Sequence, residues 1–163
     1  MPGGTEDFNI RKLTNRQISK LIFRNLNTLN PDVMSNRVVH FEIPCDDPEK
    51  NMKFFSEVFG WTFEQFGNEP YWSITTGDDS KPGINGGLMK KRDPQQPVAN
   101  SIAVGDIDRS MAHVTAAGGT IVVDKMAVPS IGWLAYFKDP DGNIHGLFQD
   151  DPSAVYEPGV QAS

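Results

Sequence analysis

His40 and Glu42 are the two side chains of this 163-residue chain whose types and spacing best suit proton transfer. They lie two positions apart in the run 37–44, which has the β-branched and aromatic composition of a strand. Because side chains alternate across a strand, both project from one face, while Phe41 and Ile43 project from the other. A carboxylate can orient and charge an imidazole for acid-base chemistry. The alternative is that His40 only makes hydrogen bonds inside the fold or at a dimer interface.

The composition favours one ordinary globular domain and excludes several classes of protein. The chain has a mass of 18.0 kDa and a formal charge of -6, which disfavours broad nucleic-acid binding because that requires a basic surface. Its one cysteine, Cys45, cannot form an internal disulfide or a cysteine-rich zinc site, so we expect a reducing, cytoplasmic setting. We find no long apolar run and no signal-peptide pattern, and expect no membrane partner.

An internal repeat organises the chain from residue 37 onward. Shifting the sequence by 59 positions without a gap gives nine identities in fifty positions, among them Ile43/Ile102, Asp47/Asp106, Met52/Met111, Gly60/Gly119, Gly87/Gly146 and Leu88/Leu147. The count is only suggestive, but the matched residues fall at corresponding places in two similar segments. A fixed offset of this kind indicates a duplicated supersecondary unit.

Each copy reads as a β-α-β-β-β unit, so the predicted fold class is α+β, with two βαβββ modules. A strand at 37–44 or 99–104 leads to a helix begun by Asp47, or by Asp106 or Asp108, and ended at glycine. The inward stripe of the first helix is predicted to be Met52, Phe55 and Phe59, and that of the second Met111 and Val114. Three strands then follow in each copy, at 61–66, 71–76 and 84–90, and at 120–126, 132–138 and 143–149.

Residues 1–36 are predicted to form a helical extension outside the repeat. Thr14 and Gln17 have the spacing of a capping box, and an apolar stripe follows at helical spacing until Pro31, which predicts a helix over 15–29. This helix could lie on a membrane surface, but we expect it to pack on its own domain or on a second subunit. We therefore predict a homodimer. The repeat in turn predicts a main domain at 37–151, with modules 37–92 and 96–151, and a tail at 152–163.

The repeated unit, the Phe59-Gly-Trp61 helix end and the turn Lys138-Asp-Pro-Asp-Gly-Asn143 together resemble the vicinal-oxygen-chelate superfamily. This superfamily holds glyoxalase I, bleomycin-resistance proteins and extradiol dioxygenases. The resemblance covers roughly residues 37–151. It implies two βαβββ modules around a cleft, commonly with a divalent metal at the base.

The metal-ligand positions that the resemblance implies are His40, Gly87, Ala99 and Gly146. Only His40 has a metal-binding side chain, and a stable mononuclear site normally needs three or more protein ligands. We therefore disfavour a divalent metal cofactor. Metal-dependent glyoxalase I activity and extradiol dioxygenase activity become improbable for the same reason.

The remaining candidates are residues that would line a ligand cleft: Trp72, Asn85, Gly87, Ser101, Trp133, Gly146 and Phe148. The glycines would leave room for a ligand at the cleft floor, or would only relieve bending and close packing. The tryptophans would form walls for a flat ligand, or would only pack in the core.

Two functions stay open at this point. The first is a small-molecule enzyme, a glyoxalase-like lyase or isomerase, with an incomplete metal site and acid-base chemistry at His40 and Glu42. The second is a protein of the bleomycin-resistance type that binds and sequesters a small molecule without catalysis. Fold analogy alone does not decide between them.

Overall fold

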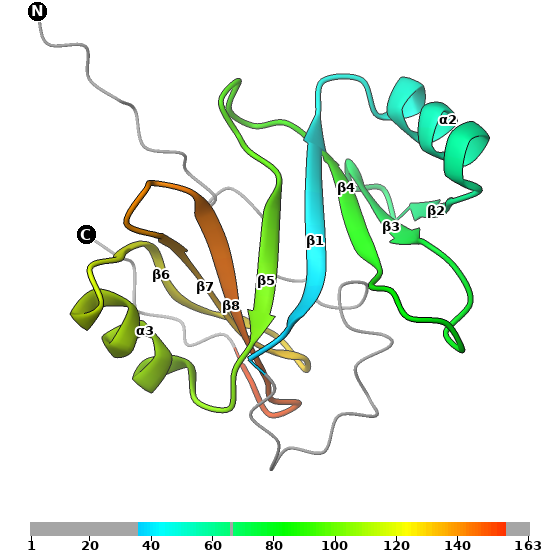
Figure 1. Cartoon of the computed structure of the whole chain (residues 1–163). Coiled ribbons are helices and arrows are strands. Elements are labelled where there is room, and N and C mark those ends of the chain that lie inside the picture. The colour runs from blue at the N-terminus through cyan, green and yellow to red at the C-terminus, as the bar shows by residue number, and fades with distance from the viewer. Residues whose placement is uncertain (1–35, 66, 156–163) are drawn as a thin grey trace, which may run out of the picture.

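An open, curved, eight-stranded sheet with two helices forms the protein in a computed structural model, which describes residues 36–65 and 67–155 (Figure 1). The expected α+β class is confirmed. The predicted helix over 15–29 and the end of the predicted tail lie outside the described residues. None of the helices in the described part of the chain has the length and apolar character needed to cross a bilayer.

The order strand, helix and three strands occurs twice along the described chain. The first half contains β1 (Val38–Cys45), α2 (Pro48–Phe59), β2 (Thr62–Gln65), β3 (Tyr71–Thr75) and β4 (Gly86–Lys90). The second half contains β5 (Ala99–Ala103), α3 (Ile107–Ala116), β6 (Thr120–Val128), β7 (Gly132–Lys138) and β8 (Ile144–Asp150). These bounds lie close to those that the repeat predicts.

The two halves join through β1 and β5 at the middle of the sheet. The strand order is β2-β3-β4-β1-β5-β8-β7-β6. β1 pairs in parallel with β4 and antiparallel with β5, while β5 pairs in parallel with β8. β1 and β5 are thus the two central strands of the sheet.

Both helices begin where the sequence predicts. The Asp47 side chain accepts a 3.0 Å hydrogen bond from the amide of Lys50, and Pro48 occupies the first helical position. In the second half Asp106 plays the same part, accepting a 2.9 Å bond from the amide of Arg109. α2 ends at Gly60, whose φ of 70° places it in the left-handed region that favours glycine.

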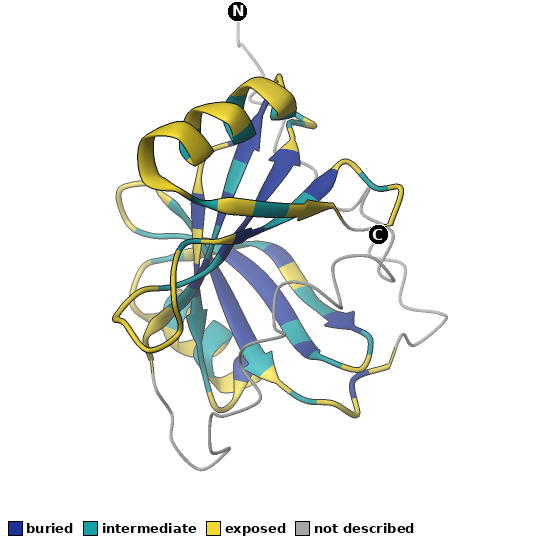
Figure 2. Ribbon diagram, turned by 90° about the vertical axis from the view of Figure 1, so that its right-hand side faces the viewer, coloured by how far each residue is buried: buried dark blue, intermediate teal, exposed yellow. Residues whose placement is uncertain are grey.

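The sheet has an outer face, which the two helices cover, and an inner face on which the two halves turn toward each other (Figure 2). On the outer face Ile74 and Leu88 form a cluster with Met52 of α2, while Ile107, Ala135 and Leu147 form one under α3. Met111 and Val114 pack there as expected. Phe59 does not: it is exposed, because α2 lies over the short strand β2 at the edge of the sheet.

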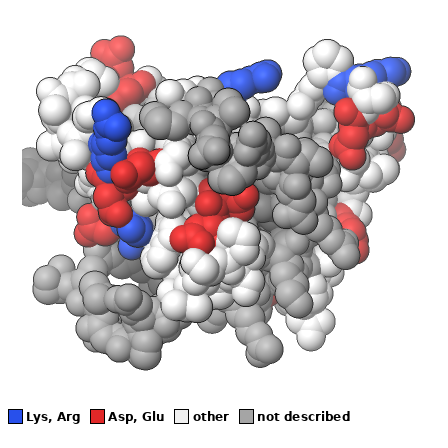
Figure 3. All heavy atoms as spheres, turned by 90° about the horizontal axis from the view of Figure 1, so that it is seen from below, with Lys and Arg blue, Asp and Glu red and all other residues white. Residues whose placement is uncertain are grey.

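Inner-face side chains form a separate core, which contains Tyr71, Met89, Leu134, Tyr136 and Phe148. On the face seen from below, acidic groups gather in several places while basic groups are scattered (Figure 3). The described residues on that face thus present no continuous basic surface, in keeping with the net charge of -6.

Candidate functional site

His40 and Glu42 lie on the inner face of β1, as strand alternation predicts. Their residues are only 2% and 6% exposed. On the outer face of the same strand Phe41, Ile43 and Cys45 pack in the cluster that includes Met52. A histidine and a glutamate buried in the middle of a sheet must have polar partners to offset their desolvation.

Glu42 has its polar partner on the other half of the molecule. The hydroxyl of Tyr136, on β7, donates a 3.0 Å hydrogen bond to Oε2 of Glu42. Burial raises the pKa of Glu42 from 4.5 to about 7, although the Tyr136 hydrogen bond and the charge of Arg92 both act to lower it. In the described part of the chain Oε1 makes no hydrogen bond. The carboxyl group is thus partly ionised near neutral pH, with Oε1 accepting no hydrogen bond from the described residues.

The protonation state of His40 differs from the sequence prediction, in which a neighbouring carboxylate favours a charged imidazole. Burial lowers the pKa of His40 from 6.5 to about 3, so the imidazole is neutral across the physiological range. Its Nε2 atom lies 3.4 Å from the hydroxyl of Tyr71 on β3. Of the pair predicted from the sequence, Glu42 therefore titrates near neutral pH, and His40 serves as a neutral hydrogen-bonding group.

Strand register brings Ser101 into the same group. His40 is opposite Ser101 on β5, and Ser101 is in turn opposite Gly146 on β8. Ser101 is buried. We call the five inner-face residues His40, Glu42, Tyr71, Ser101 and Tyr136 the polar cluster.

The two glycines predicted to leave room for a ligand instead leave room for members of the polar cluster. A Cβ atom on Gly87 would overlap the hydroxyl of Tyr71. A Cβ atom on Gly146 would lie 2.7 Å from Oγ of Ser101. The missing side chains thus admit a phenol and a hydroxyl to the cluster, which corrects the interpretation of the glycines as an open cleft floor.

Both tryptophans lie on the outer face, away from the polar cluster. Trp72 packs in the cluster under α2, and Trp133 packs in the cluster under α3 and donates a 2.9 Å hydrogen bond to Asp151. Trp72 directly follows the inner-face residue Tyr71, and Trp133 lies three positions before the inner-face residue Tyr136. Strand alternation therefore turns both tryptophans outward. The structure therefore corrects the prediction of tryptophan ligand walls in favour of core packing.

The last two predicted cleft residues, Phe148 and Asn85, lie in different parts of the fold. Phe148 is buried in the inner core with Tyr71 and Tyr136. Asn85 lies before β4, and its side-chain oxygen accepts a 2.9 Å hydrogen bond from the amide of Thr76 at the end of β3. Asn85 thus holds the connection between two strands and is not part of the polar cluster.

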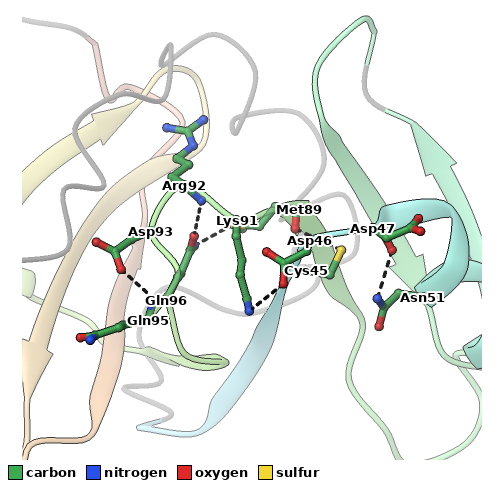
Figure 4. Close-up of polar contacts among 10 residues, drawn as sticks. All are labelled: Cys45, Asp46, Asp47, Asn51, Met89, Lys91, Arg92, Asp93, Gln95 and Gln96. Atoms are coloured by element: carbon green, nitrogen blue, oxygen red, sulfur yellow. Dashed lines mark hydrogen bonds and ion pairs between the residues drawn. The ribbon is translucent and has the colours of Figure 1, made fainter.

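Arg92 is a basic residue near the cluster that the sequence analysis did not single out. It lies just beyond β4, where its amide donates a 3.1 Å hydrogen bond to the side chain of Gln96 (Figure 4). The guanidinium points away from Asp93 and from the Lys91–Asp46 ion pair, and makes no hydrogen bond or ion pair in the described chain. Its charge favours ionised Glu42.

Tyr71 and Tyr136 are two further members of the polar cluster that the sequence prediction does not include. Strand alternation is a sequence signal that identifies both. Tyr136 is one position beyond the outward-facing Ala135 and three beyond Trp133, and Tyr71 precedes Trp72 directly. The larger tryptophans, Trp72 and Trp133, lie on the opposite face of the same strands. Applying alternation to β3 and β7 from a known outward residue selects the tyrosines.

The donor set does not fit a divalent metal. Within residues 36–65 and 67–155, no group of three or more His, Cys, Asp or Glu side chains could hold a metal ion. The positions of Gly87 and Gly146 lie beside a phenol and a serine hydroxyl, where the resemblance would require carboxylates. We derive no chemistry through a metal.

The chain matches a known family and several relatives in sequence. A model of the Glyoxalase/Bleomycin resistance protein/Dioxygenase superfamily matches residues 37–145. A glyoxylase-like domain-containing protein from Didymella fabae is 27% identical over 121 residues, which cover 71% of this chain and 94% of that protein. A putative glyoxylase from Mycobacterium bovis is 29% identical over 116 residues, which cover 68% of this chain and 43% of the relative.

Solved structures share the fold. A glyoxalase/bleomycin resistance protein/dioxygenase superfamily member from Vibrio splendidus superposes with a TM-score of 0.51 at 23% identity, over 70% of this chain and 98% of that one. An Mn(II)-bound glyoxalase from Novosphingobium aromaticivorans gives 0.55 at 16% identity, over 79% and 43%. These low identities establish the architecture alone. The family model, which matches residues 37–145, shows that the chain belongs to the glyoxalase/bleomycin resistance protein/dioxygenase superfamily.

Proposed function

We propose that this protein is a small-molecule enzyme whose acid-base group is Glu42. The observation that carries the proposal is a buried carboxyl group with a pKa of about 7, one oxygen of which accepts no hydrogen bond from residues 36–65 and 67–155. A group that is half ionised near neutral pH can both take and return a proton, which is the property required of a general acid-base catalyst. No metal is needed for that step.

Each member of the polar cluster has a role in this proposal. Tyr136 holds Oε2 of Glu42, which leaves Oε1 to take a proton from a substrate C–H or O–H bond and to return it to another atom of the same substrate. The bonding electrons stay on the substrate, so the net reaction is an isomerisation. His40 stays neutral, and in the tautomer whose Nε2–H donates to Tyr71 the Tyr71 hydroxyl is left to donate its hydrogen to a substrate oxygen that gains charge during the transfer.

The competing function is non-catalytic binding of a small molecule, and the apolar character of the inner core supports it. Apolar and aromatic side chains surround the polar cluster, among them Phe148, Leu134 and Met89. Such a lining suits a small apolar or aromatic compound held by a few polar groups. In that case Glu42 and Tyr136 orient the ligand, and no proton is transferred.

Solvent deuterium exchange separates the two functions. The names of the sequence relatives suggest small aldehydes and ketones as the first compounds to incubate with the protein in D2O. Enzyme function predicts protein-dependent deuterium incorporation beside the carbonyl, detected by proton NMR. Glu42→Gln should reduce that rate by about two to four powers of ten. Glu64→Gln, which removes an exposed carboxylate on β2, is the matched control.

The result that would defeat the enzyme proposal is saturable binding of a compound with no exchange. Exchange that survives Glu42→Gln unchanged would also defeat it. We further propose that the catalytic unit is the domain at 37–151, with residues 1–36 as an extension that is not needed for the chemistry.

A further inference from the structure

Arg92 has a guanidinium group that no acidic side chain of the described residues contacts. The residue is exposed and lies two positions beyond the end of β4. Lys91, directly before it, forms an ion pair with Asp46 at 3.2 Å. Figure 4 shows the Arg92 guanidinium pointing away from that pair and from Asp93. Its N–H donors are therefore not used within the described part of the chain.

The backbone of Arg92 is tied to the inner core through Gln96. The buried side chain of Gln96 accepts a 3.1 Å hydrogen bond from the amide of Arg92, and its Nε2 atom lies 3.2 Å from the sulfur of Met89. Met89 packs in the inner core with Tyr71. Both ends of the Gln96 amide group are thus engaged, which fixes the position at which Arg92 leaves the sheet. A fixed anchor lowers the entropic cost of binding a ligand there.

Strand pairing places Arg92 at the end of the sheet toward which β1 and β4 both run. The amide of Lys91 donates a 2.8 Å hydrogen bond to the carbonyl of Cys45, which continues the β1–β4 ladder. Glu42 lies three residues earlier on β1, about 10 Å along the strand. The charge of Arg92 acts on Glu42 and favours its ionised form. One small molecule can therefore contact both the exposed cation and the buried carboxyl group.

The acidic groups that face Arg92 are Glu69 and Glu42. Partial burial lowers the pKa of Arg92, whereas the charges of Glu69 and Glu42 raise it. Neither carboxylate forms an ion pair with the guanidinium in the described chain, so an anion from solution displaces no existing contact. The net charge of -6 gives the whole protein no attraction for anions. The local charge of Arg92 would therefore decide whether an anionic compound binds near Glu42.

A carboxylate is the anion that suits a single guanidinium. Two parallel N–H groups of arginine match the two oxygens of a carboxylate, and one positive charge balances one negative charge. A phosphate group carries up to two negative charges and would keep one uncompensated. Burying an unpaired charge is costly, so a substrate whose carbonyl end reaches Glu42 must leave its charged end at the surface. Arg92 is placed to meet that end.

We propose that Arg92 binds the carboxylate of the substrate, and that the substrates are oxo acids in which several carbon atoms separate the carboxylate from the carbonyl group. The inference rests on the proposed acid-base function of Glu42 and adds the substrate class to it. In this arrangement the carbon chain lies against the inner core beside Met89. Arg92 is a binding residue and takes no part in the proton transfer.

Paired ligands that differ in charge test the proposal on the full chain. Levulinate and 5-oxohexanoate are each compared with the methyl ester, which keeps the carbonyl group and the carbon chain but has no negative charge. Ligand-observed NMR measures binding, and deuterium incorporation in D2O measures the chemistry. The wild type should prefer each acid over its ester by about 10- to 100-fold, the usual effect of a charge-assisted hydrogen bond. Added salt should reduce that preference.

Substitution of Arg92 should remove the preference for the acid in both measurements. Arg92→Gln also changes the pKa of Glu42, so the ratio of acid to ester is compared at each pH. Arg92→Lys keeps the charge but loses the paired N–H groups, and should keep part of the preference. Arg109→Gln is the matched control, because it removes an exposed arginine from α3, on the outer face, and should leave the ratio unchanged.

The outcomes distinguish this inference from the proposed function. An acid that binds no more tightly than its ester would overturn the inference, and so would a preference that survives Arg92→Gln. Equal exchange of acid and ester that depends on Glu42 would overturn the substrate class while supporting the enzyme. Preferential binding of the acid without exchange would overturn the enzyme while supporting Arg92 as the carboxylate-binding residue.

Discussion

Tyr136 donates a hydrogen bond to Glu42 across 94 positions of sequence, from a strand of the second half of the chain to the first strand of the first half. The oxygen–oxygen distance is 3.0 Å, and both residues are buried. The contact joins the two halves at the group that we propose transfers protons. It also opposes the effect of burial by favouring the ionised carboxylate.

Tyr136→Phe should therefore raise the pKa of Glu42 above its already elevated value. Burial would remain while the stabilising hydrogen bond is lost. The variant should also lose about 1 to 3 kcal/mol of unfolding free energy, the usual effect of removing a hydrogen bond to a charged or buried group. The pH midpoint of activity and urea unfolding measure the two effects. An unchanged midpoint would show that the hydroxyl does not act on Glu42.

Stability should fall as the pH rises through the titration of Glu42. The unfolded chain releases this proton near pH 4.5, while the folded protein holds it until about pH 7. Between these values the folded state binds more protons, so raising the pH favours unfolding, by about 3 kcal/mol in total. Comparing wild type with Glu42→Gln isolates this effect. As the pH rises from 4.5 to 7, the unfolding free energy of wild type should fall relative to that of Glu42→Gln.

His40 should have the opposite pH dependence. In the unfolded chain the imidazole gains a proton near pH 6.5, while burial delays this to about pH 3 in the folded protein. Stability from the neutral ring is therefore complete above pH 6.5 and is lost as the pH falls toward 3, with a slope approaching about 1.4 kcal/mol per pH unit. His40→Gln should reduce this loss of unfolding free energy on the acid side (the acid limb of the stability profile), as measured by urea unfolding. An acid limb as steep as in wild type would assign it to other groups.

Gly87→Ala should destabilise the protein, because its methyl group would displace the hydroxyl of Tyr71 from beside His40. Overpacking of this kind typically lowers the unfolding free energy by about 1 to 3 kcal/mol. Adding Tyr71→Phe removes the overlapping oxygen and should recover part of the loss. Gly77→Ala is the control, since nothing lies within 4 Å of its added methyl group, and it should be nearly neutral. Equal effects at both glycines would argue against the close approach of Tyr71.

Arg92→Gln should raise the pKa of Glu42, because the guanidinium charge favours the carboxylate form. Arg92→Lys keeps the positive charge and should leave the pH midpoint close to that of wild type. The pH profile of activity for the three proteins provides the comparison. A profile that does not respond to loss of the charge would show that solvent screens Arg92 from Glu42.

The sequence predicts the elements better than the site, for a physical reason. Asp47, Pro48 and Gly60 act through neighbours in sequence, so local rules locate α2 closely. Alternation likewise places His40 and Glu42 on the inner face. The exposure of Phe59 depends instead on α2 lying over an edge strand, which is a property of the assembled sheet.

The polar cluster depends on contacts that no local pattern encodes. Tyr71 reaches His40 across 31 positions, and Tyr136 reaches Glu42 across 94. The glycines at 87 and 146 have no side chain of their own, so their purpose appears only when the opposing strand is in place. The neutral state of His40 follows from burial by residues of several strands. Strand register, which the sequence alone does not specify, decides all of these features.

Direct titration of Glu42 by carbon-13 NMR is the measurement closest to the central claim. The carboxyl signal in protein labelled at glutamate is assigned by its absence from the Glu42→Gln spectrum. A midpoint near pH 7 is the result that the account predicts, because burial outweighs the hydrogen bond from Tyr136 and the charge of Arg92. A midpoint near the ordinary value of 4.5 would contradict it, because the raised pKa that carries the proposal would then be absent and Glu42 would not be poised to return the proton near neutral pH.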